Sequence, residues 1–429
     1  MGAQEAGQRP RTARRLAAAS LAVLLLAQGS LLFAIDRGPR PAEAPEPRAP
    51  RLGVPVEIED PSGHALDAFG AALRRAGAHQ GIARVAWFGA SHTAGDQYVG
   101  RIRERLQARF GDAGAGFVSP VQPFAWSGNR AARVRSGGPW RVLRVDRGPV
   151  GEAYGYAGHA VESLRGGSWG TIDSLGGDSG PHRVGTYEIF FLRRPGGGRF
   201  EVRIDDRPVA VVDTEADAPR TGYARFRVRD REHRIAVRAL GRNPVRIFGV
   251  VLERDRSGVV VDTLGIPGSR ARGLLRGNDG IYREHLRRRR PDLVVLAYGT
   301  NESEDARVPL TRYEADLRRV VRRVRQTVPA ASCLLVGPSD RPIRQADGSW
   351  AARPLTASVV AVQRRVSRDE GCGFFDTVAF MGGPLTMPAW AAASPPYAQP
   401  DHVHLTPLGY ERLAEVLGDD LVAGISEAP

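Results

Sequence analysis

One serine and one aspartate–histidine pair could act together as a nucleophile, a base and its orienting partner. Ser91 lies in "WFGASHTAGD", and Asp401 and His404 lie in "DHVHLTPLGYERL". A serine hydroxyl is a poor nucleophile at neutral pH unless a neighbouring base removes its proton. His404 can be that base, and Asp401, three residues earlier, can hold its imidazole in one tautomer. The alternative for Ser91 alone is an ordinary helix N-cap.

Two further segments could stabilise the oxyanion that acyl transfer creates. Gly265 lies in "DTLGIPGSRA" and Asn301 in "LAYGTNE". The backbone N–H groups of Ser91 and Gly265 and the side-chain amide of Asn301 would supply hydrogen-bond donors to such a charge. The complete set predicts a serine-dependent acyl-transfer site without a cofactor or a metal ion.

The elements that must position these residues alternate between apolar strands and amphipathic helices. "RVAW" precedes the serine, and "PDLVVLAYG", "SCLLVG" and "GFFDT" are separated by the helical patterns "TRYEADLRRVVRRVRQ" and "TASVVAVQRRVSRD". This alternation predicts an α/β fold with a parallel sheet covered on both faces. The polar residues fall at or beside the C-terminal ends of strands, where open α/β sheets bind ligands.

The middle of the chain has a different texture. Short strands such as "TYEIFFLRR", "GRFEVRIDD" and "GYARFRVRD" follow one another with Gly, Pro, Asn or Asp turns and no helices. This pattern predicts an inserted antiparallel β-sandwich over residues 135–256. The α/β domain would then comprise residues 55–134 and 257–429.

These motifs together resemble those of the SGNH (GDSL-type) hydrolases, which carry Ser, Gly, Asn and a C-terminal Asp-x-x-His in this order. Ser91, Gly265, Asn301, Asp401 and His404 match those blocks, and the resemblance covers the α/β portion, about two-thirds of the chain. It implies a three-layer α/β fold and a serine esterase. The segment "SHTAGD" and the insert resemble the branch that removes O-acetyl groups from peptidoglycan, in which a carbohydrate-binding-like jelly roll lies between the first two blocks.

One position departs from the family pattern. The family has Gly-Asp-Ser where this chain has Gly-Ala90-Ser91. The triad is unaffected on paper, but the change leaves two alternatives to an esterase open. One is an O-acetyltransferase that uses the same triad, and the other is a catalytically silent carbohydrate-binding surface protein.

The N-terminus predicts an exported protein. Four arginines precede the uncharged run from Leu16 to Ala34, and a Pro-rich linker over residues 36–54 follows. Residues 1–35 therefore fit a membrane anchor or a signal peptide, with the globular part in the cell envelope, on the periplasmic side of the cytoplasmic membrane, or secreted if the segment is cleaved. The expected partners are an acylated polysaccharide and, through this segment, the membrane.

The net charge of +14 does not by itself indicate a nucleic-acid partner. All 61 basic residues are arginine, they alternate with acids on predicted helix faces, and no recognition motif accompanies them. We therefore expect no nucleic acid partner.

Several other residues admit two interpretations each. His92 is either a second base or part of the loop wall, and His402 with His404 has a spacing that also suits a metal. The cysteines Cys333 and Cys372 form a disulfide or remain two buried thiols. Aromatic residues near the insert either stack on sugar rings or pack in the core; they are Trp126, Trp140, Trp169, Tyr154 and Tyr156. Two polar residues after "CLLVG", Asp340 and Arg341, either line the site or lie at the surface.

Overall fold

The computed structural model of the protein describes residues 52–174 and 182–423. The predicted anchor or signal segment 1–35 and most of the linker 36–54 lie outside the described residues. Within the described ranges, no helix combines the length and the apolar composition needed to cross a membrane.

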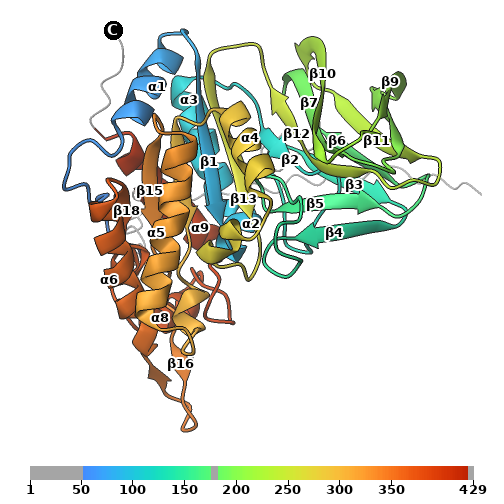
Figure 1. The fold of residues 1–429 in the computed structure, drawn as a ribbon. Helices are drawn as coiled ribbons and strands as arrows, with labels where there is room; N and C mark the ends of the chain where they lie inside the picture. The colour runs from blue at the N-terminus through green and yellow to red at the C-terminus, as the bar shows by residue number, and fades with distance from the viewer. Residues whose placement is uncertain (1–51, 175–181, 424–429) are drawn as a thin grey trace, which may run out of the picture. The chain divides into compact units, whose positions relative to one another are not determined.

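A five-stranded parallel sheet forms the centre of the α/β part (Figure 1). Its order is β13-β1-β14-β15-β18. The strand β13, which follows β1 in this sheet along the chain, therefore forms one edge of the sheet, and β14 and the later strands lie on the other side of β1. The strand bounds are β1 (Ile82–Gly89), β13 (Gly258–Gly265), β14 (Leu293–Ala297), β15 (Ser332–Val336) and β18 (Gly373–Phe375). Their apolar runs are buried because helices cover both faces of the sheet.

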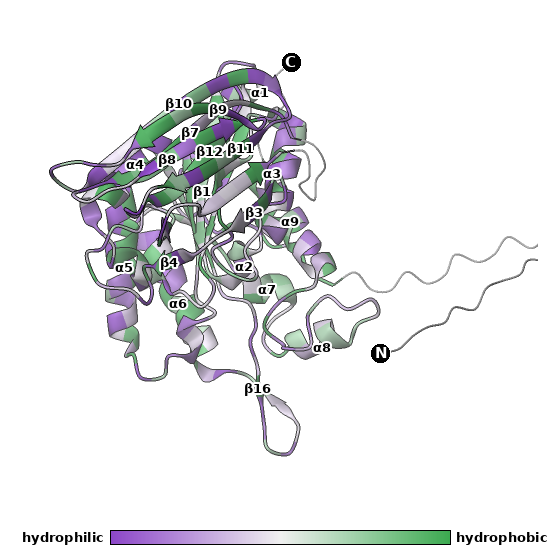
Figure 2. Cartoon of the chain, turned by 90° about the vertical axis from the view of Figure 1, so that its right-hand side faces the viewer, coloured by the Kyte–Doolittle hydropathy of each residue, from purple (hydrophilic) through white to green (hydrophobic). Residues whose placement is uncertain are grey.

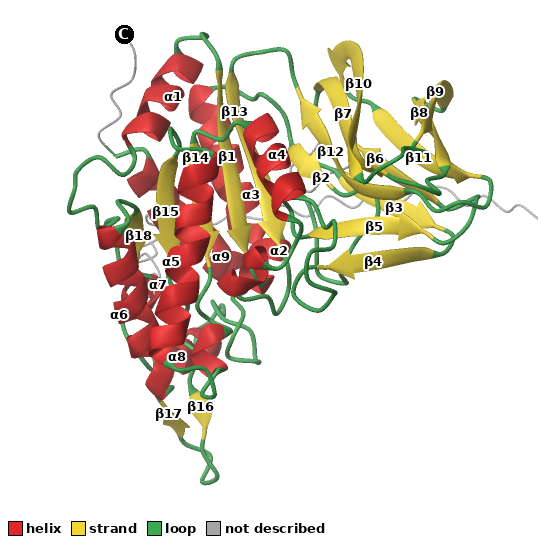
Figure 3. Ribbon diagram, in the orientation of Figure 1, coloured by secondary structure: helices red, strands yellow, loops and turns green. Residues whose placement is uncertain are grey.

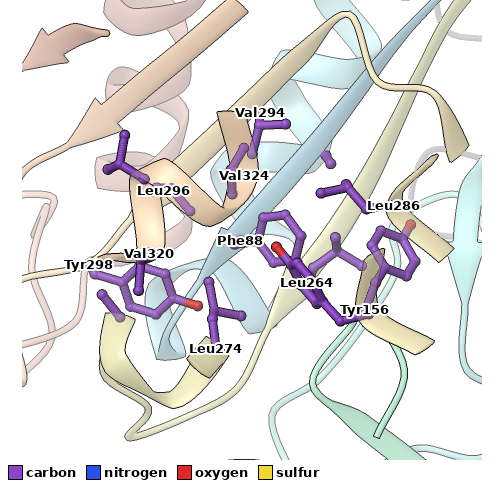
Figure 4. Packing of buried hydrophobic residues seen from close by; sticks show 14 of the residues in the cluster. Phe88, Tyr156, Leu264, Leu274, Leu286, Val294, Leu296, Tyr298, Val320 and Val324 are labelled. Carbon is purple, nitrogen blue, oxygen red and sulfur yellow. The ribbon is translucent and has the colours of Figure 1, made fainter. Parts of the chain in front are cut away.

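Alternate residues of β1 point to opposite faces and belong to two separate cores. Trp87 packs in the cluster with α1, α3 and α9, whereas Phe88 packs in the cluster with α4, α5 and α6. Figure 3 shows the helices on the two sides of the sheet, and Figure 4 shows the packing around Phe88. The helix bounds are α1 (Asp67–Gly77), α2 (Ser91–Ala94), α3 (Gln97–Phe110), α4 (Asp279–Arg289), α5 (Leu310–Thr327), α6 (Pro354–Asp369), α7 (Thr377–Met381), α8 (Met387–Ala392) and α9 (Pro407–Leu421), with 3₁₀ turns η1 (Ala271–Leu275) and η2 (Glu302–Glu304).

The longer helices are amphipathic, as their sequences predict. In α5, Leu317, Val320, Val321 and Val324 are buried, while arginines fill the outer face. Figure 2 shows this mixture of hydrophilic and hydrophobic residues on α5 and α6. The apolar stripe holds each helix on the sheet.

Two antiparallel sheets lie beside the α/β part. One has the order β10-β7-β12-β5-β4 with β2 paired to β12, and the other has the order β3-β6-β11-β8-β9. Their facing side chains form one apolar cluster that includes Ile189, Phe200 and Ile247, so the two sheets pack as a sandwich. The bounds are β2 (Gly116–Val118), β3 (Arg133–Gly137), β4 (Trp140–Arg144), β5 (His159–Ser163), β6 (Trp169–Asp173), β7 (Val184–Arg193), β8 (Arg199–Ile204), β9 (Arg207–Asp213), β10 (Arg220–Arg231), β11 (Arg234–Leu240) and β12 (Arg246–Glu253), and a small hairpin joins β16 (Ile343–Arg344) to β17 (Trp350–Ala351).

The antiparallel part shares a core with the α/β part. Phe117 of β2 and Phe190 of β7 pack in the same cluster as Phe88, and the rings of Phe117 and Tyr156 are 5.0 Å apart. The antiparallel strands also begin at Gly116, ahead of the predicted boundary at residue 135, because β2 pairs with β12. Three residues are too few to show a strand period, which is why the sequence does not reveal β2.

The two cysteines are joined. Cys333 of β15 and Cys372, the residue before β18, form a disulfide with their Cα atoms 4.6 Å apart. The two strands are neighbours in the sheet, which brings the two residues within bonding reach.

Candidate active site

Ser91, His404 and Asp401 form one hydrogen-bonded chain. The Oγ of Ser91 lies 2.9 Å from Nε2 of His404, and Nδ1 of His404 lies 2.7 Å from Oδ2 of Asp401. In the tautomer that donates from Nδ1 to the carboxylate, Nε2 is free to accept the hydroxyl proton. The three predicted residues are thus brought together from the two ends of the described chain in the order that nucleophile, base and orienting acid require.

The turn after β1 presents the nucleophile. Ser91 is the first residue of α2, so its N–H has no acceptor within the helix. Gly89 is required two residues earlier because a Cβ there would lie 2.1 Å from Oγ1 of Thr93. Ala90, where the family has aspartate, is 7% exposed and packs in the apolar cluster beneath the turn.

The loop before α9 holds the Asp401 carboxylate with its own backbone N–H groups. Oδ1 of Asp401 accepts the N–H groups of Val403 at 2.9 Å and of His404 at 3.0 Å. Partial burial acts to raise the pKa of Asp401, but the hydrogen bonds from His404 and these N–H groups outweigh it and lower the pKa. Asp401 is therefore ionised at neutral pH and can stabilise a charged His404.

Gly265 ends β13 beside the turn that carries Ser91. It pairs with Gly89 of β1, and the N–H of Ile266 takes the Gly89 carbonyl at 3.0 Å, so the Gly265 N–H points away from β1. A Cβ at Gly265 would lie 2.2 Å from the backbone nitrogen of Ala94. Glycine therefore allows the end of β13 to approach the turn that carries Ser91.

Asn301 is held through its side chain by a neighbouring loop, and among the described residues it makes no hydrogen bond to the triad. It follows β14, and its Nδ2 donates to the carbonyl of Ser269 at 2.9 Å, which uses one of its two N–H bonds. Nearby, the buried carboxylate of Glu302 accepts the N–H groups of Ala271 at 2.8 Å and Gly299 at 3.0 Å. These bonds tie the loop after β13 to the loop after β14 and fix the orientation of the Asn301 amide.

His92 forms the wall behind the base. Its Nδ1 lies 2.9 Å from the hydroxyl of Tyr410 and its Nε2 lies 3.3 Å from the hydroxyl of Ser339. Burial, followed by the proximity of His404, lowers the pKa of His92 to about 3. His92 is therefore neutral at neutral pH and hydrogen-bonded in the loop wall, and the base in contact with Ser91 is His404.

A cavity of about 680 Å³ opens onto the triad. It is lined by the triad and Gly265 on the α/β side and by Arg133 and Val134 of β3 on the antiparallel side, whereas Asn301 is not among its lining residues. The loop of residues 119–130, which joins β2 to β3, supplies a further part of the cavity wall. Such a cavity can hold a substrate that is larger than an acyl group alone.

Asp96 anchors that wall, although none of the motifs in the sequence assigns it a role. Its carboxylate is fully buried and accepts from Arg103 at 2.7 Å, from the N–H of Arg130 at 2.7 Å and from Oγ1 of Thr263 at 2.5 Å. One side chain thus joins α3, the cavity wall and β13 two residues before Gly265. The signal available in the sequence was an acid in "SHTAGD" followed seven residues later by Arg103.

The remaining candidates separate into core and surface residues. Tyr154 and Tyr156 are buried in apolar clusters, and Trp140 donates to the carbonyl oxygens of Gly137 and Trp169. Asp340 is buried and accepts the N–H of Met387 at 2.9 Å, so it holds a loop and does not line the cavity.

Two further candidates also lie away from the cavity. Arg341 bonds to the carbonyl of Thr300 and pairs with Glu304. The ring of His402 packs on Trp350 with centroids 4.2 Å apart. Among the residues that the structure describes, no cluster of His, Cys, Asp or Glu could hold a metal ion.

Comparison with known proteins gives a family-model match over part of the chain and a shared fold. Residues 233–412 match the model of the GDSL-like Lipase/Acylhydrolase family, a range that includes Gly265, Asn301, Asp401 and His404. No curated protein sequence gives a match. A solved structure described as "Peptidoglycan O-acetylesterase in action, 5 min" has a TM-score of 0.72 and 22% identity, and the match covers 86% of this chain and 99% of that chain.

A family two carbohydrate esterase from Cellvibrio japonicus has a TM-score of 0.29 and 12% identity, covering 68% of this chain and 97% of that chain. The family match and the fold of the first structure agree with the hydrogen-bonded triad. They confirm the resemblance to the SGNH (GDSL-type) hydrolases stated from the sequence: residues 233–412 match the model of the GDSL-like Lipase/Acylhydrolase family, and the chain shares the fold of the first solved structure.

Proposed function

We propose that this protein is a serine esterase that removes O-acetyl groups from an extracytoplasmic polysaccharide, with peptidoglycan as the first candidate. The observation that carries the proposal is the hydrogen-bonded chain from Ser91 through His404 to Asp401 in the lining of a cavity of about 680 Å³. The fold shared with a peptidoglycan O-acetylesterase supports the choice of polymer.

The geometry suits a two-step mechanism. Ser91 Oγ attacks the ester carbonyl while His404 Nε2 accepts its proton, and Asp401 stabilises the resulting imidazolium. The oxyanion receives hydrogen bonds from the N–H groups of Ser91 and Gly265 and from Asn301. The tetrahedral intermediate then expels the sugar hydroxyl, which takes the proton from His404.

The second step releases the acetate. A water molecule attacks the acetyl–serine ester while His404 accepts one of its protons. The second tetrahedral intermediate then breaks its bond to Ser91 Oγ, which takes the proton back from His404, and acetic acid leaves and ionises to acetate. If a sugar hydroxyl takes the place of this water, the same site transfers the acetyl group. The fate of the acetyl group therefore separates the esterase from the transferase.

The direct test measures acetate released from O-acetylated peptidoglycan and from acetylated xylan. We expect the wild-type protein to release acetate from one of them, Ser91→Ala to release none, and Asp401→Asn to be slower by about 10³–10⁴. Ser349→Ala, which removes an exposed hydroxyl in the hairpin between β16 and β17, serves as the matched control and should keep full activity. Equal rates for wild type and Ser91→Ala would contradict the proposal.

We further propose that residues 16–34 hold the protein at the outer face of the cytoplasmic membrane. The support is the basic flank, the uncharged run and the Pro-rich linker in the sequence. A protein held in this way stays in the membrane fraction after a high-salt wash and is released by detergent. A mature N-terminus near Ile35 would instead show a cleaved signal peptide.

A further inference from the structure

One large aromatic side chain stands exposed beside the catalytic base. Trp126 is 70% exposed, and its ring meets the ring of His404 edge to face with centroids 5.9 Å apart. It also lines the cavity that contains Ser91. Single exposed apolar residues are common on protein surfaces, so the exposure of Trp126 alone indicates no function. Its position beside His404 and in the cavity lining is the informative observation.

The loop that carries Trp126 is fixed on both sides of it. The hydroxyl of Ser127 accepts from the N–H of Phe124 at 3.2 Å and donates to its carbonyl at 2.8 Å, and the Gln122 amide donates to the carbonyls of Ala125 and Ser127. Below the turn, the Phe124 ring packs against His159 at 5.4 Å and under the Arg144 guanidinium at 4.7 Å. The loop is therefore already ordered with one face of the indole in solvent. Because of this, little further conformational entropy of the loop is lost when a ligand binds.

The same loop is tied to the catalytic turn. The N–H of Gly128 donates to the carbonyl of Ala94 at 3.1 Å, and the N–H of Arg130 donates to Asp96 at 2.7 Å. Ala94 ends the short helix that Ser91 begins. The distance from the indole to the reacting atoms is therefore set by the fold.

The chemistry around Trp126 favours a sugar ring. The C–H face of a pyranose is apolar and suits the negative face of an indole. Side chains with planar amide or guanidinium groups line the same cavity and can bond to sugar hydroxyls; they are Gln97, Gln122, Asn129, Arg130, Arg133 and Gln399. Because Arg133 belongs to β3, the antiparallel part contributes to this cavity.

From this arrangement we infer that Trp126 is the platform on which the acetylated pyranose ring stacks, and that it selects sugar esters over simple esters. The inference rests on the proposed function and adds a specificity-determining residue to it. The ring positions the sugar so that its acetyl carbonyl meets Ser91. The antiparallel part then acts as one wall of the catalytic cleft.

The test compares two acetate esters that differ in the sugar ring. Ethyl acetate has none, whereas methyl 6-O-acetyl-α-D-glucopyranoside carries a pyranose; acetate release from both is followed by titration. For Trp126→Ala, we expect KM for the pyranoside to rise and the ratio of kcat/KM, pyranoside to ethyl acetate, to fall by about tenfold or more. Trp126→Phe keeps an aromatic face and should restore most of that ratio.

A second tryptophan supplies the control. Trp169 is 38% exposed on β6 and does not line the cavity, so Trp169→Ala should leave the ratio unchanged. An unchanged ratio in Trp126→Ala would overturn the inference. Equal losses on both esters would also overturn it, because they would show that the indole only packs against His404.

A binding measurement separates this inference from the proposed function. The tryptophan fluorescence of Ser91→Ala is titrated with the same pyranoside and compared with that of Ser91→Ala/Trp126→Phe. A change in emission in the first protein that is lost in the second supports the platform even if the wild-type protein releases no acetate. Identical titrations in the two proteins would overturn it.

Discussion

The ring of His92 lies beside the ring of His404, with centroids 5.2 Å apart, but the two histidines have different partners. His404 contacts Ser91 and Asp401, whereas His92 contacts Tyr410 and Ser339. Because His92 stays neutral, it adds no positive charge to oppose the imidazolium that the proposed reaction would form on His404.

This relationship predicts that His92 supports the site without acting as a base. Asn can keep a hydrogen bond near the position of Nδ1, so His92→Asn should lower kcat by less than about tenfold. Since the pKa of His92 is about 3, the acid limb of the kcat/KM profile should keep its midpoint in the variant. A loss comparable with that of His404→Ala would assign His92 to the proton transfer.

The proposed function gives Asn301 two separable contributions, one to the loop and one to the reaction. Its bond to Ser269 is worth about 1 kcal/mol of unfolding free energy, as is typical of a neutral hydrogen bond. An oxyanion donor is worth about 10²–10³ in kcat. We therefore expect Asn301→Ala to lose both, as measured by melting temperature and kcat on one preparation.

The isosteric variant Asn301→Asp sharpens this test, because it keeps the size of the side chain but has no N–H to donate. It should also lose kcat by about 10²–10³. Reduced stability with an unchanged kcat in Asn301→Ala would remove Asn301 from the oxyanion hole and leave it a loop residue.

Substitution of Asp96 should lower the free energy of unfolding more than substitution of an exposed polar residue. Its pair with Arg103 is almost fully buried, with side chains 0% and 1% exposed. Asp96→Asn leaves the guanidinium without this counter-charge, and we expect the free energy of unfolding to fall by about 3–5 kcal/mol in urea denaturation. Asp419→Asn is the control, because its pair with Arg105 is exposed and worth less than about 1 kcal/mol.

A small loss in Asp96→Asn, similar to that of the control, would show that the loop and helix α3 hold their places without this carboxylate. The same preparations should be assayed for activity. Because Asp96 holds the N–H of Arg130, the variant should also lose selectivity for sugar esters.

His159 makes stability depend on pH. Burial lowers its pKa to about 4 and outweighs a hydrogen bond with the backbone of Ala157, which acts to raise it. Below pH 6.5 the unfolded chain binds a proton that the folded chain excludes, so the free energy of unfolding falls as the pH drops from about 6.5 to about 4. The contribution of this group approaches about 1.4 kcal/mol per pH unit within that window.

His159→Phe should remove this contribution, so its free energy of unfolding should fall less than that of the wild type between about pH 6.5 and about pH 4. The measurement is denaturation in urea at several pH values between 4 and 7. His64→Phe, at an exposed histidine, should leave the slope of unfolding free energy against pH as it is in the wild type. An unchanged slope in His159→Phe would mean that the imidazole is not held neutral.

The sequence was sufficient for the features that depend on local pattern. Apolar runs and helical periodicity indicated the elements that became β14, α5, β15 and α6, because a strand buried on both faces and a helix buried on one face leave these signatures over few residues. The order of the motifs likewise indicated Ser91 and His404, and their place at the ends of strands predicted that they would share one edge of the sheet.

Only the tertiary structure decided which distant side chains meet. The contact of Trp126 with His404, the bonds of Asp96 to the cavity wall and the pairing of β2 with β12 join segments that lie far apart in the sequence. The same holds for Asn301, whose partner is a carbonyl in another loop. Such contacts depend on how sheets and loops pack, and no spacing within one segment encodes that packing.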